Sequence, residues 1–212
     1  HFKRKQLNSL YVQNSRGKFE LELLSALKQP MLDLRKLSWD LSLFMTQEFN
    51  FLALGPQYLT GSSIMPNKSN PDVVELMRGS YAVIAGHYAE LENLLSLPSG
   101  YHRDLQLTKR SLIHSIHTVS KALSLVPGLI KSIKVNKSRS AECIDESMLM
   151  TDQAYALVQT GVPFRDAYMS VKEKAGHQPK LAKKTAVSSS AGSPHNLQLK
   201  SLSSRLVKLT KG

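Results

Sequence analysis

The sequence predicts an all-α protein, a bundle of long helices followed by a smaller helical part. Two observations lead to this prediction. Apolar residues recur at helical spacing through three long stretches, and each stretch is bounded by glycine, proline or asparagine. No strand pairs of note and no internal repeat interrupt them. We therefore expect a helical bundle domain over residues 1–138 and a small helical domain over residues 139–212.

The first long helix is expected over residues 17–50. Its apolar stripe consists of Leu27, Met31, Leu34, Leu41 and Met45. Pro30 lies inside this stretch, and an interior proline costs a helix about 3 kcal/mol because it removes a hydrogen bond and clashes with the preceding turn. We expect Pro30 to kink the helix or to split it.

The second and third long helices are expected over residues 71–96 and 104–134, and residues 56–70 are expected to form an irregular loop. The second stripe runs through Val73, Met77, Tyr81, Ile84, Tyr88, Leu91 and Leu95. The third runs through Leu112, Ile116, Val119, Leu123 and Val126, and should end or bend near Pro127. Shorter helices are expected at 145–159 and 163–174.

The second helix carries small residues where a surface helix would carry charges, among them Ser80, Ala82 and Ala85. Helices of this kind need burial against several neighbours. Three of them cannot cover one another fully. We expect other segments or other subunits to complete the bundle.

Composition places the chain among ordinary globular proteins. Of its 212 residues 42% are hydrophobic, and no apolar run approaches the roughly 20 residues that span a bilayer. No N-terminal targeting pattern is present, so we expect no membrane partner. Cys143 is the only cysteine; it excludes an internal disulfide and favours a reducing compartment, by default the cytoplasm.

The net charge of +12 is concentrated at the C-terminal end. Between Val171 and Gly212 there are nine lysines and arginines against the single acid Glu173. A basic tail of this kind can attract nucleic acid, but this one has no aromatic residue for base stacking. We expect a solvated, loosely ordered terminus and no nucleic-acid partner.

The segment Gly61–Pro71, which reads GSSIMPNKSNP, concentrates the chemistry of the chain. Ser62 and Ser63 offer hydroxyls, and Lys68 an ammonium with three donors. Asn70 can cap a helix that has proline at its first position and an acid in its first turn. A hydroxyl and an ammonium before a positive helix end form a suitable site for a multiply charged anion.

This segment resembles the GSSxMPxKxNP signature of the fumarase/aspartase superfamily, whose members eliminate fumarate from substituted succinates. Two further segments are similar to argininosuccinate lyase in particular: Tyr101–Lys109, YHRDLQLTK, and Gly161–Ala167, GVPFRDA. The resemblance implies part of the central helical domain of that fold. Argininosuccinate lyases are about twice as long, and the chain begins at His1, so we expect it to cover only their C-terminal half.

The resemblance also implies roles for individual residues. Ser62 would be the general base, and Lys68 and Asn70 would hold the carboxylate that gains charge. Glu75 would orient a histidine from the absent half. The substrate-binding positions would be Ser63, Tyr101, Gln106 and Lys109.

The resemblance further implies argininosuccinate as substrate, arginine and fumarate as products, no cofactor or metal, and a homotetramer whose active sites draw on several subunits. Arg16 lies where the family has a polar turn near the active site. The pair His114 and His117 has helical spacing that metals can use, but with no third ligand beside it we expect packing. We expect the 212-residue chain alone to be inactive.

Two alternatives stay open. The first is a sibling lyase with another substituted succinate, since Asn67, Ser69, His102 and Tyr168 depart from the family's usual residues. The second is a non-catalytic structural protein, like the lens crystallins derived from this family. The Tyr101–Lys109 segment argues against the first, and the intact Ser62, Lys68 and Asn70 argue against the second.

Overall fold

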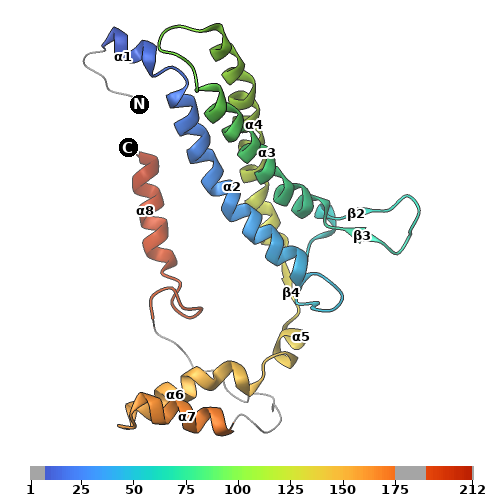
Figure 1. Cartoon of the computed structure of the whole chain (residues 1–212). Helices are drawn as coiled ribbons and strands as arrows, with labels where there is room; N and C mark the ends of the chain where they lie inside the picture. The colour runs from blue at the N-terminus through green and yellow to red at the C-terminus, as the bar shows by residue number, and fades with distance from the viewer. Residues whose placement is uncertain (1–7, 175–189, 212) are drawn as a thin grey trace. The chain divides into compact units, whose positions relative to one another are not determined.

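The computed structural model describes residues 8–174 and 190–211, and it confirms the all-α prediction (Figure 1). The described residues form eight α-helices: α1 (Ser9–Asn14), α2 (Lys18–Phe44), α3 (Asp72–Leu94), α4 (Thr108–Ser132), α5 (Lys137–Glu142), α6 (Met150–Gln159), α7 (Phe164–Lys174) and α8 (Leu199–Lys211). The chain divides into two compact units between Lys137 and Ser138.

The first unit is built on α2, α3 and α4, which lie side by side (Figure 1). Their shared core contains Met31, Leu34 and Leu41 from α2, Val74, Met77 and Ile84 from α3, and Val119, Ala122 and Leu129 from α4. Each large apolar side chain buried here contributes about 1.5–3 kcal/mol. This core holds the two ends of α3 in place, and the candidate site residues lie at those ends.

Neither interior proline ends its helix. Helix α2 continues through Pro30, and α4 continues through Pro127 to Ser132. A split at Pro30 and an end at Pro127 are therefore ruled out; the alternatives, a kink at Pro30 and a bend near Pro127, stay predictions. Buried residues on both sides of each proline, such as Leu24 and Met31 around Pro30, keep the helix in register with its neighbours.

The stripe expected to face inward on α4 is also wrong in part. Val119 is buried, but Ile116 and Leu123 are 40% and 43% exposed. The buried face of α4 instead carries mostly small residues, listed here in order: Thr108, Ser111, Ser115, Val119 and Ala122. Leu129, nearer the C-terminal end, is the one larger leucine among the buried residues of this helix. Small side chains let α4 approach its neighbours closely, and this turns the larger apolar residues outward.

Several large apolar side chains of the first unit consequently face away from its core. Leu76 on α3 is 72% exposed and Ile113 on α4 is 65% exposed. Patches of this kind mark surfaces that are covered by another part of a protein or by a partner. No helix among residues 8–174 and 190–211 is long and apolar enough to cross a membrane.

The segment between α2 and α3 is more regular than expected. It contains a 3-10 turn at Pro56–Tyr58 and three two-residue strands: β1 (Leu52–Ala53), β2 (Thr60–Gly61) and β3 (Ser69–Asn70). β1 pairs antiparallel with β4 (Lys134–Val135) after α4, and β2 pairs antiparallel with β3. The prediction of an irregular loop over 56–70 is thus wrong at its two ends, which pair.

The second unit contains a helical hairpin of α6 and α7. Ala154, Ala167 and Val171 are buried, and the Tyr155 and Phe164 rings lie 6.0 Å apart. Gly161 joins the two helices with a φ of 96°, a left-handed conformation that glycine adopts without strain. Helix α8 was not expected in the basic tail; residues 175–189 and 212 of that tail lie outside the described residues.

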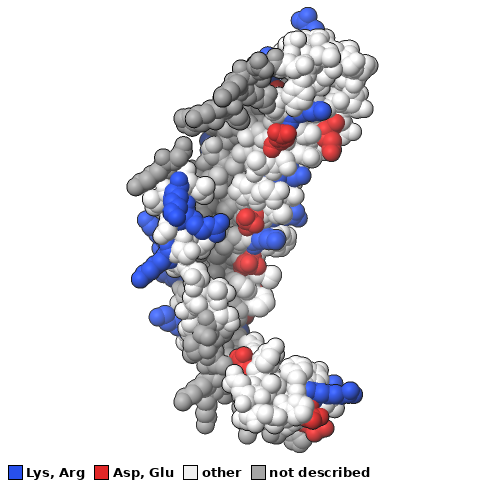
Figure 2. Space-filling view, turned by 90° about the vertical axis from the view of Figure 1, so that its left-hand side faces the viewer, with Lys and Arg blue, Asp and Glu red and all other residues white. Residues whose placement is uncertain are grey.

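Charged side chains of both signs share the surface of α2. Its bases Lys18, Lys28, Arg35 and Lys36 alternate along the sequence with the acids Glu20, Glu22, Asp33 and Asp40. Figure 2 shows one face of the molecule, on which acidic side chains lie among basic ones. This mixture does not favour a nucleic-acid surface on α2.

A polar seam joins α3 to α4. The His87 Nδ1 lies 2.9 Å from the Ser115 Oγ, and the Ser111 hydroxyl donates to the Glu90 carboxylate over 2.6 Å. Burial lowers the pKa of the His87 ring below its ordinary value of 6.5; His114 lowers it further, Glu90 raises it, and Arg110 lowers it. The seam therefore stabilises the uncharged form of His87.

The stability that this seam contributes should accordingly decrease as the pH is lowered. In the unfolded chain His87 takes up a proton near its ordinary pKa of 6.5, whereas the folded chain resists protonation until lower pH. The free energy of unfolding is lost as pH falls from the unfolded pKa towards the lowered folded one. Urea unfolding at pH 7.5 and 5.5 should show a larger loss for the wild type than for His87→Gln. His117→Gln is the matched control; an equal loss in all three proteins would refute the prediction.

Candidate active site

The segment predicted to be catalytic is the connection between β2 and β3. The register pairs Thr60 with Asn70 and Gly61 with Ser69. Ser62 directly follows β2 and Lys68 directly precedes β3. The predicted hydroxyl and ammonium are therefore carried by the first and last residues of one short loop.

The two serines of the motif differ in their surroundings. The Ser62 Oγ accepts hydrogen bonds from the backbone N–H groups of Ile64 and Met65, over 3.2 and 3.1 Å. Donors aimed at an oxygen stabilise its charged form. Ser62 is half-buried, whereas Ser63 is exposed. Of the two hydroxyls, Ser62 is the one whose surroundings favour negative charge.

The start of α3 differs by one residue from the expected one. The N-cap is Pro71, with no side-chain capping bond, and Asp72 is the first helical residue. The expectation of Asn70 as N-cap is therefore wrong, because Asn70 is held in β3 opposite Thr60. The Thr60 hydroxyl donates to the Asp72 carboxylate and ties the hairpin to the helix. The Asn70 amide is thus not used to cap α3.

Glu75 lies on the first turn of α3 beside a cavity of about 570 Å³. Arg35 and Arg78 also line it, each stacked on an aromatic ring: Arg35 over Tyr81 at 5.1 Å and Arg78 over Trp39 at 4.3 Å. Glu75 is exposed, and no ion pair to it is found in the described ranges 8–174 and 190–211. Its carboxylate is open to a group from outside these residues.

The other predicted substrate residues gather beyond the C-terminal end of α3. Gln106 lies in the 3-10 helix Arg103–Leu107, and Lys109 lies in the first turn of α4. The Lys109 ammonium donates to the Gln106 Oε1 over 2.7 Å. Tyr101 precedes them and is 66% exposed. An ammonium, an amide and a phenol in one open region are suited to a carboxylate.

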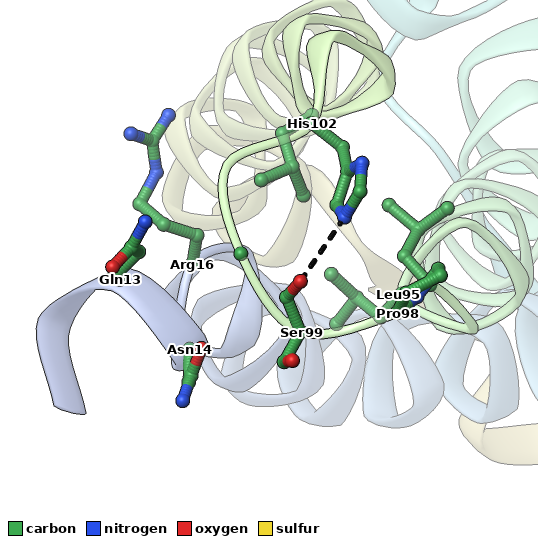
Figure 3. A pocket seen from close by; sticks show the side chains of 10 residues that line it. Gln13, Asn14, Arg16, Leu95, Pro98, Ser99 and His102 are labelled. Carbon is green, nitrogen blue, oxygen red and sulfur yellow. Dashed lines mark hydrogen bonds between the residues drawn. The ribbon is translucent and has the colours of Figure 1, made fainter. Parts of the chain in front are cut away.

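A cavity of about 290 Å³ adjoins this region (Figure 3). The end of α1 supplies Gln13 and Asn14, the α1–α2 turn supplies Arg16, and the α3–α4 connection supplies Ser99 and His102. The His102 Nε2 lies 3.4 Å from the Ser99 carbonyl oxygen. Arg16, which the resemblance placed at a polar turn near the active site, also contacts Tyr101. A local sequence pattern could not predict this contact, because the two residues are 85 positions apart.

The structure does not bring the two groups of site residues together. The hairpin precedes α3 and Tyr101 follows it, and a helix of 23 residues is about 34 Å long. Figure 1 shows the β2–β3 hairpin and the α3–α4 connection at opposite ends of α3. One small molecule cannot contact both groups in the same chain.

Among the residues that the structure describes, no group of three or more His, Cys, Asp or Glu side chains is placed to hold a metal ion. His114 and His117 instead line a largely apolar cavity between α3 and α4, and the His114 ring lies 5.2 Å from that of His87.

Sequence comparison finds proteins that this chain resembles. Residues 6–86 match the family model described as lyase. The chain is 47% identical over 207 residues to the argininosuccinate lyase of Xanthomonas campestris pv. campestris, covering 96% of this chain and 48% of that protein. It is 49% identical over 174 residues to the argininosuccinate lyase of Xylella fastidiosa, covering 82% and 39%. The chain spans about half the length of the curated relatives it matches.

Comparison of structures supports the fold. A class II fumarase from Schistosoma mansoni superposes with a TM-score of 0.62 at 18% identity, covering 78% of this chain and 38% of the fumarase. A fumarate lyase:delta crystallin from Brucella melitensis gives 0.62 at 21% identity, covering 81% and 39%. In sequence the chain is therefore similar to argininosuccinate lyases over about half of their length, and in fold it is similar to the fumarase and the fumarate lyase:delta crystallin.

Proposed function

We propose that this chain supplies two parts of the active sites of an argininosuccinate lyase, which eliminates fumarate from argininosuccinate and releases arginine. The observation that carries the proposal is the β2–β3 hairpin, whose loop begins with Ser62 and ends with Lys68, and in which the Ser62 oxygen accepts hydrogen bonds from two backbone N–H groups. The proposed setting is arginine biosynthesis in the cytoplasm.

The hairpin fits the difficult step of this reaction. The base must remove a weakly acidic proton next to a carboxylate, and electrons then form the C=C bond as the C–N bond breaks. In our proposal the Ser62 oxygen acts in its ionised form and becomes a hydroxyl as it takes that proton, and the N–H groups of Ile64 and Met65 stabilise its charge beforehand. The electron pair of the broken C–N bond leaves on the nitrogen of arginine. Lys68 and Asn70 stabilise the charge that accumulates on the neighbouring carboxylate. Ser63 contributes a substrate contact at the same loop.

The length of α3 decides how a complete site is assembled. Because the hairpin and the Tyr101–Lys109 region lie at opposite ends of a helix about 34 Å long, we propose that each site combines the hairpin of one copy with Tyr101, Gln106 and Lys109 of another. The exposed apolar faces of α3 and α4 support an oligomer of this kind. We propose a homotetramer, in which Glu75 orients a histidine supplied from outside this chain.

The test uses a chimaera in which this chain replaces the matching 207 residues of the Xanthomonas campestris relative. It should release arginine and fumarate from argininosuccinate, measured by the ultraviolet absorbance of fumarate. The 212-residue chain alone should be inactive. A chimaera that forms the same oligomer as the relative but releases no fumarate would refute the proposed function.

Gln106→Ala in the chimaera should mainly raise KM. The carboxylate that Gln106 and Lys109 would bind carries the same charge before and during the reaction, so losing this contact weakens both states equally. Steady-state kinetics should show kcat within about threefold of the parent and KM raised about tenfold. A fall in kcat at unchanged KM would place Gln106 at the reacting centre instead.

A further inference from the structure

Arg16 makes two contacts with one residue. Its guanidinium carbon lies 4.5 Å from the centre of the Tyr101 ring, and its Nη1 donates a hydrogen bond to the Tyr101 hydroxyl. Stacking on the ring and donation to the phenol oxygen fix both the plane of the ring and the position of its oxygen. Tyr101 is otherwise 66% exposed, on a connection between helices.

The turn that carries Arg16 is rigidly built. Ser15 before it is 1% exposed and donates its hydroxyl to the Tyr11 carbonyl over 2.5 Å. Gly17 after it has a φ of 84°, and a Cβ there would overlap the side chain of Leu95 at the end of α3. Because Gly17 has no side chain, the turn can pack directly against the end of α3. Arg16 is therefore presented to Tyr101 from a fixed backbone.

We propose that Arg16 is a positioning residue for Tyr101 in substrate binding, an inference that rests on the proposed function. A phenol has one proton to donate and lone pairs to accept. The Arg16 guanidinium, which can only donate, occupies an acceptor position of the oxygen. The phenol proton must then point elsewhere, and it is presented to an acceptor such as a substrate carboxylate. Arg16 acts through Tyr101 and requires no contact with substrate.

A purely structural role for Arg16 makes a different prediction. If Arg16 only attached the α1–α2 turn to the α3–α4 connection, its loss would lower stability and would add to the effect of losing the Tyr101 hydroxyl. If it positions the phenol, its loss has no further effect once the hydroxyl is gone. A double-mutant cycle separates the two roles.

The contact is tested first on the 212-residue chain labelled with 3-fluorotyrosine. The fluorine resonance of Tyr101 is identified by its absence in Tyr101→Phe. It should shift in Arg16→Gln and stay in place in Lys28→Gln, which removes the stacking of Lys28 on Tyr88 at 4.0 Å. An unchanged Tyr101 resonance in Arg16→Gln would overturn the inference.

The role is tested in the chimaera. Arg16→Gln and Tyr101→Phe should each raise KM about tenfold with little change in kcat, and the double variant should resemble Tyr101→Phe alone. Arg16→Lys should recover only part of the loss, because an ammonium cannot both stack and donate as a guanidinium does. Lys28→Gln should keep the parent KM.

The outcomes separate this inference from the proposed function. If Tyr101→Phe raises KM and Arg16→Gln does not, or if their effects add, the positioning role is wrong and the proposed function stands. If Tyr101→Phe leaves KM unchanged, Tyr101 has no place in substrate binding and the positioning role falls with it. An inactive chimaera overturns both.

Discussion

Replacing Ser62 by alanine in the chimaera is expected to lower kcat by about 100-fold or more, since a general base contributes roughly 10²–10⁴ to the rate. The two backbone N–H groups that the Ser62 oxygen accepts remain in the variant without the oxygen that they stabilise. KM should change little, because Ser62 acts on the reacting C–H bond in the transition state. Steady-state kinetics and a thermal melt together show whether chemistry or folding was lost.

Ser63→Ala is the matched control, since it removes the same atoms one position away. Ser63 is exposed, so the variant should keep kcat within a few-fold of the parent and change KM instead. If Ser63→Ala abolishes turnover while Ser62→Ala does not, the base is the other hydroxyl. If neither substitution slows turnover, the hairpin mechanism does not apply to this protein.

Helix positions and the motif could be predicted from the sequence because both depend on local patterns. The stripe with Met31, Leu34 and Leu41 is buried as expected, and so is the one with Met77, Ile84 and Leu91. Apolar residues at helical spacing specify one face of a helix whatever it packs against. The site motif could be read because its members lie within eleven consecutive residues.

The orientation of α4 could not be read in the same way. Its sequence offers one face with large apolar residues such as Ile116 and Leu123 and another with Ser111, Ser115 and Ala122. Burying the larger apolar area would place the first face against the neighbouring helices, whereas a close approach of the helices requires the second. Inside the first unit the second face prevails, and the larger apolar residues remain exposed. Periodicity alone cannot rank the two faces when the partners of both are unknown.

The distances in space between the site residues could not be predicted from the sequence either. Ser62 and Tyr101 are 39 positions apart, a separation that permits contact or remoteness, and a straight α3 between them produces remoteness. Arg16 and Tyr101 are 85 positions apart and touch. The length of α3 decides the first relation, and the packing of α2 against α3 decides the second.

Mixing two defective variants should restore activity, and this has the largest effect that we expect. Chimaeras carrying Ser62→Ala and Lys109→Ala are each defective at one end of α3, the first in kcat and the second in KM. Activity is therefore measured at a substrate concentration far below the KM of Lys109→Ala, where both variants are slow. If every site combines the hairpin of one copy with the Tyr101–Lys109 region of another, about a quarter of the sites in a symmetric oligomer mixed in equal amounts carry neither substitution. Fumarate release after unfolding and refolding the two together should rise towards that fraction of the parent rate.

The decisive control mixes Ser62→Ala with Lys68→Ala. Both substitutions lie in the same hairpin, on opposite sides of the β2–β3 register, so every hairpin in the mixture carries one of them. No site is then intact and no activity should return. Recovery in the first mixture and none in the second would require the hairpin to come from one copy and Lys109 from another. If neither mixture releases fumarate although sedimentation confirms oligomers, one chain would have to supply the whole site. The length of α3 forbids that unless the chain refolds around the substrate.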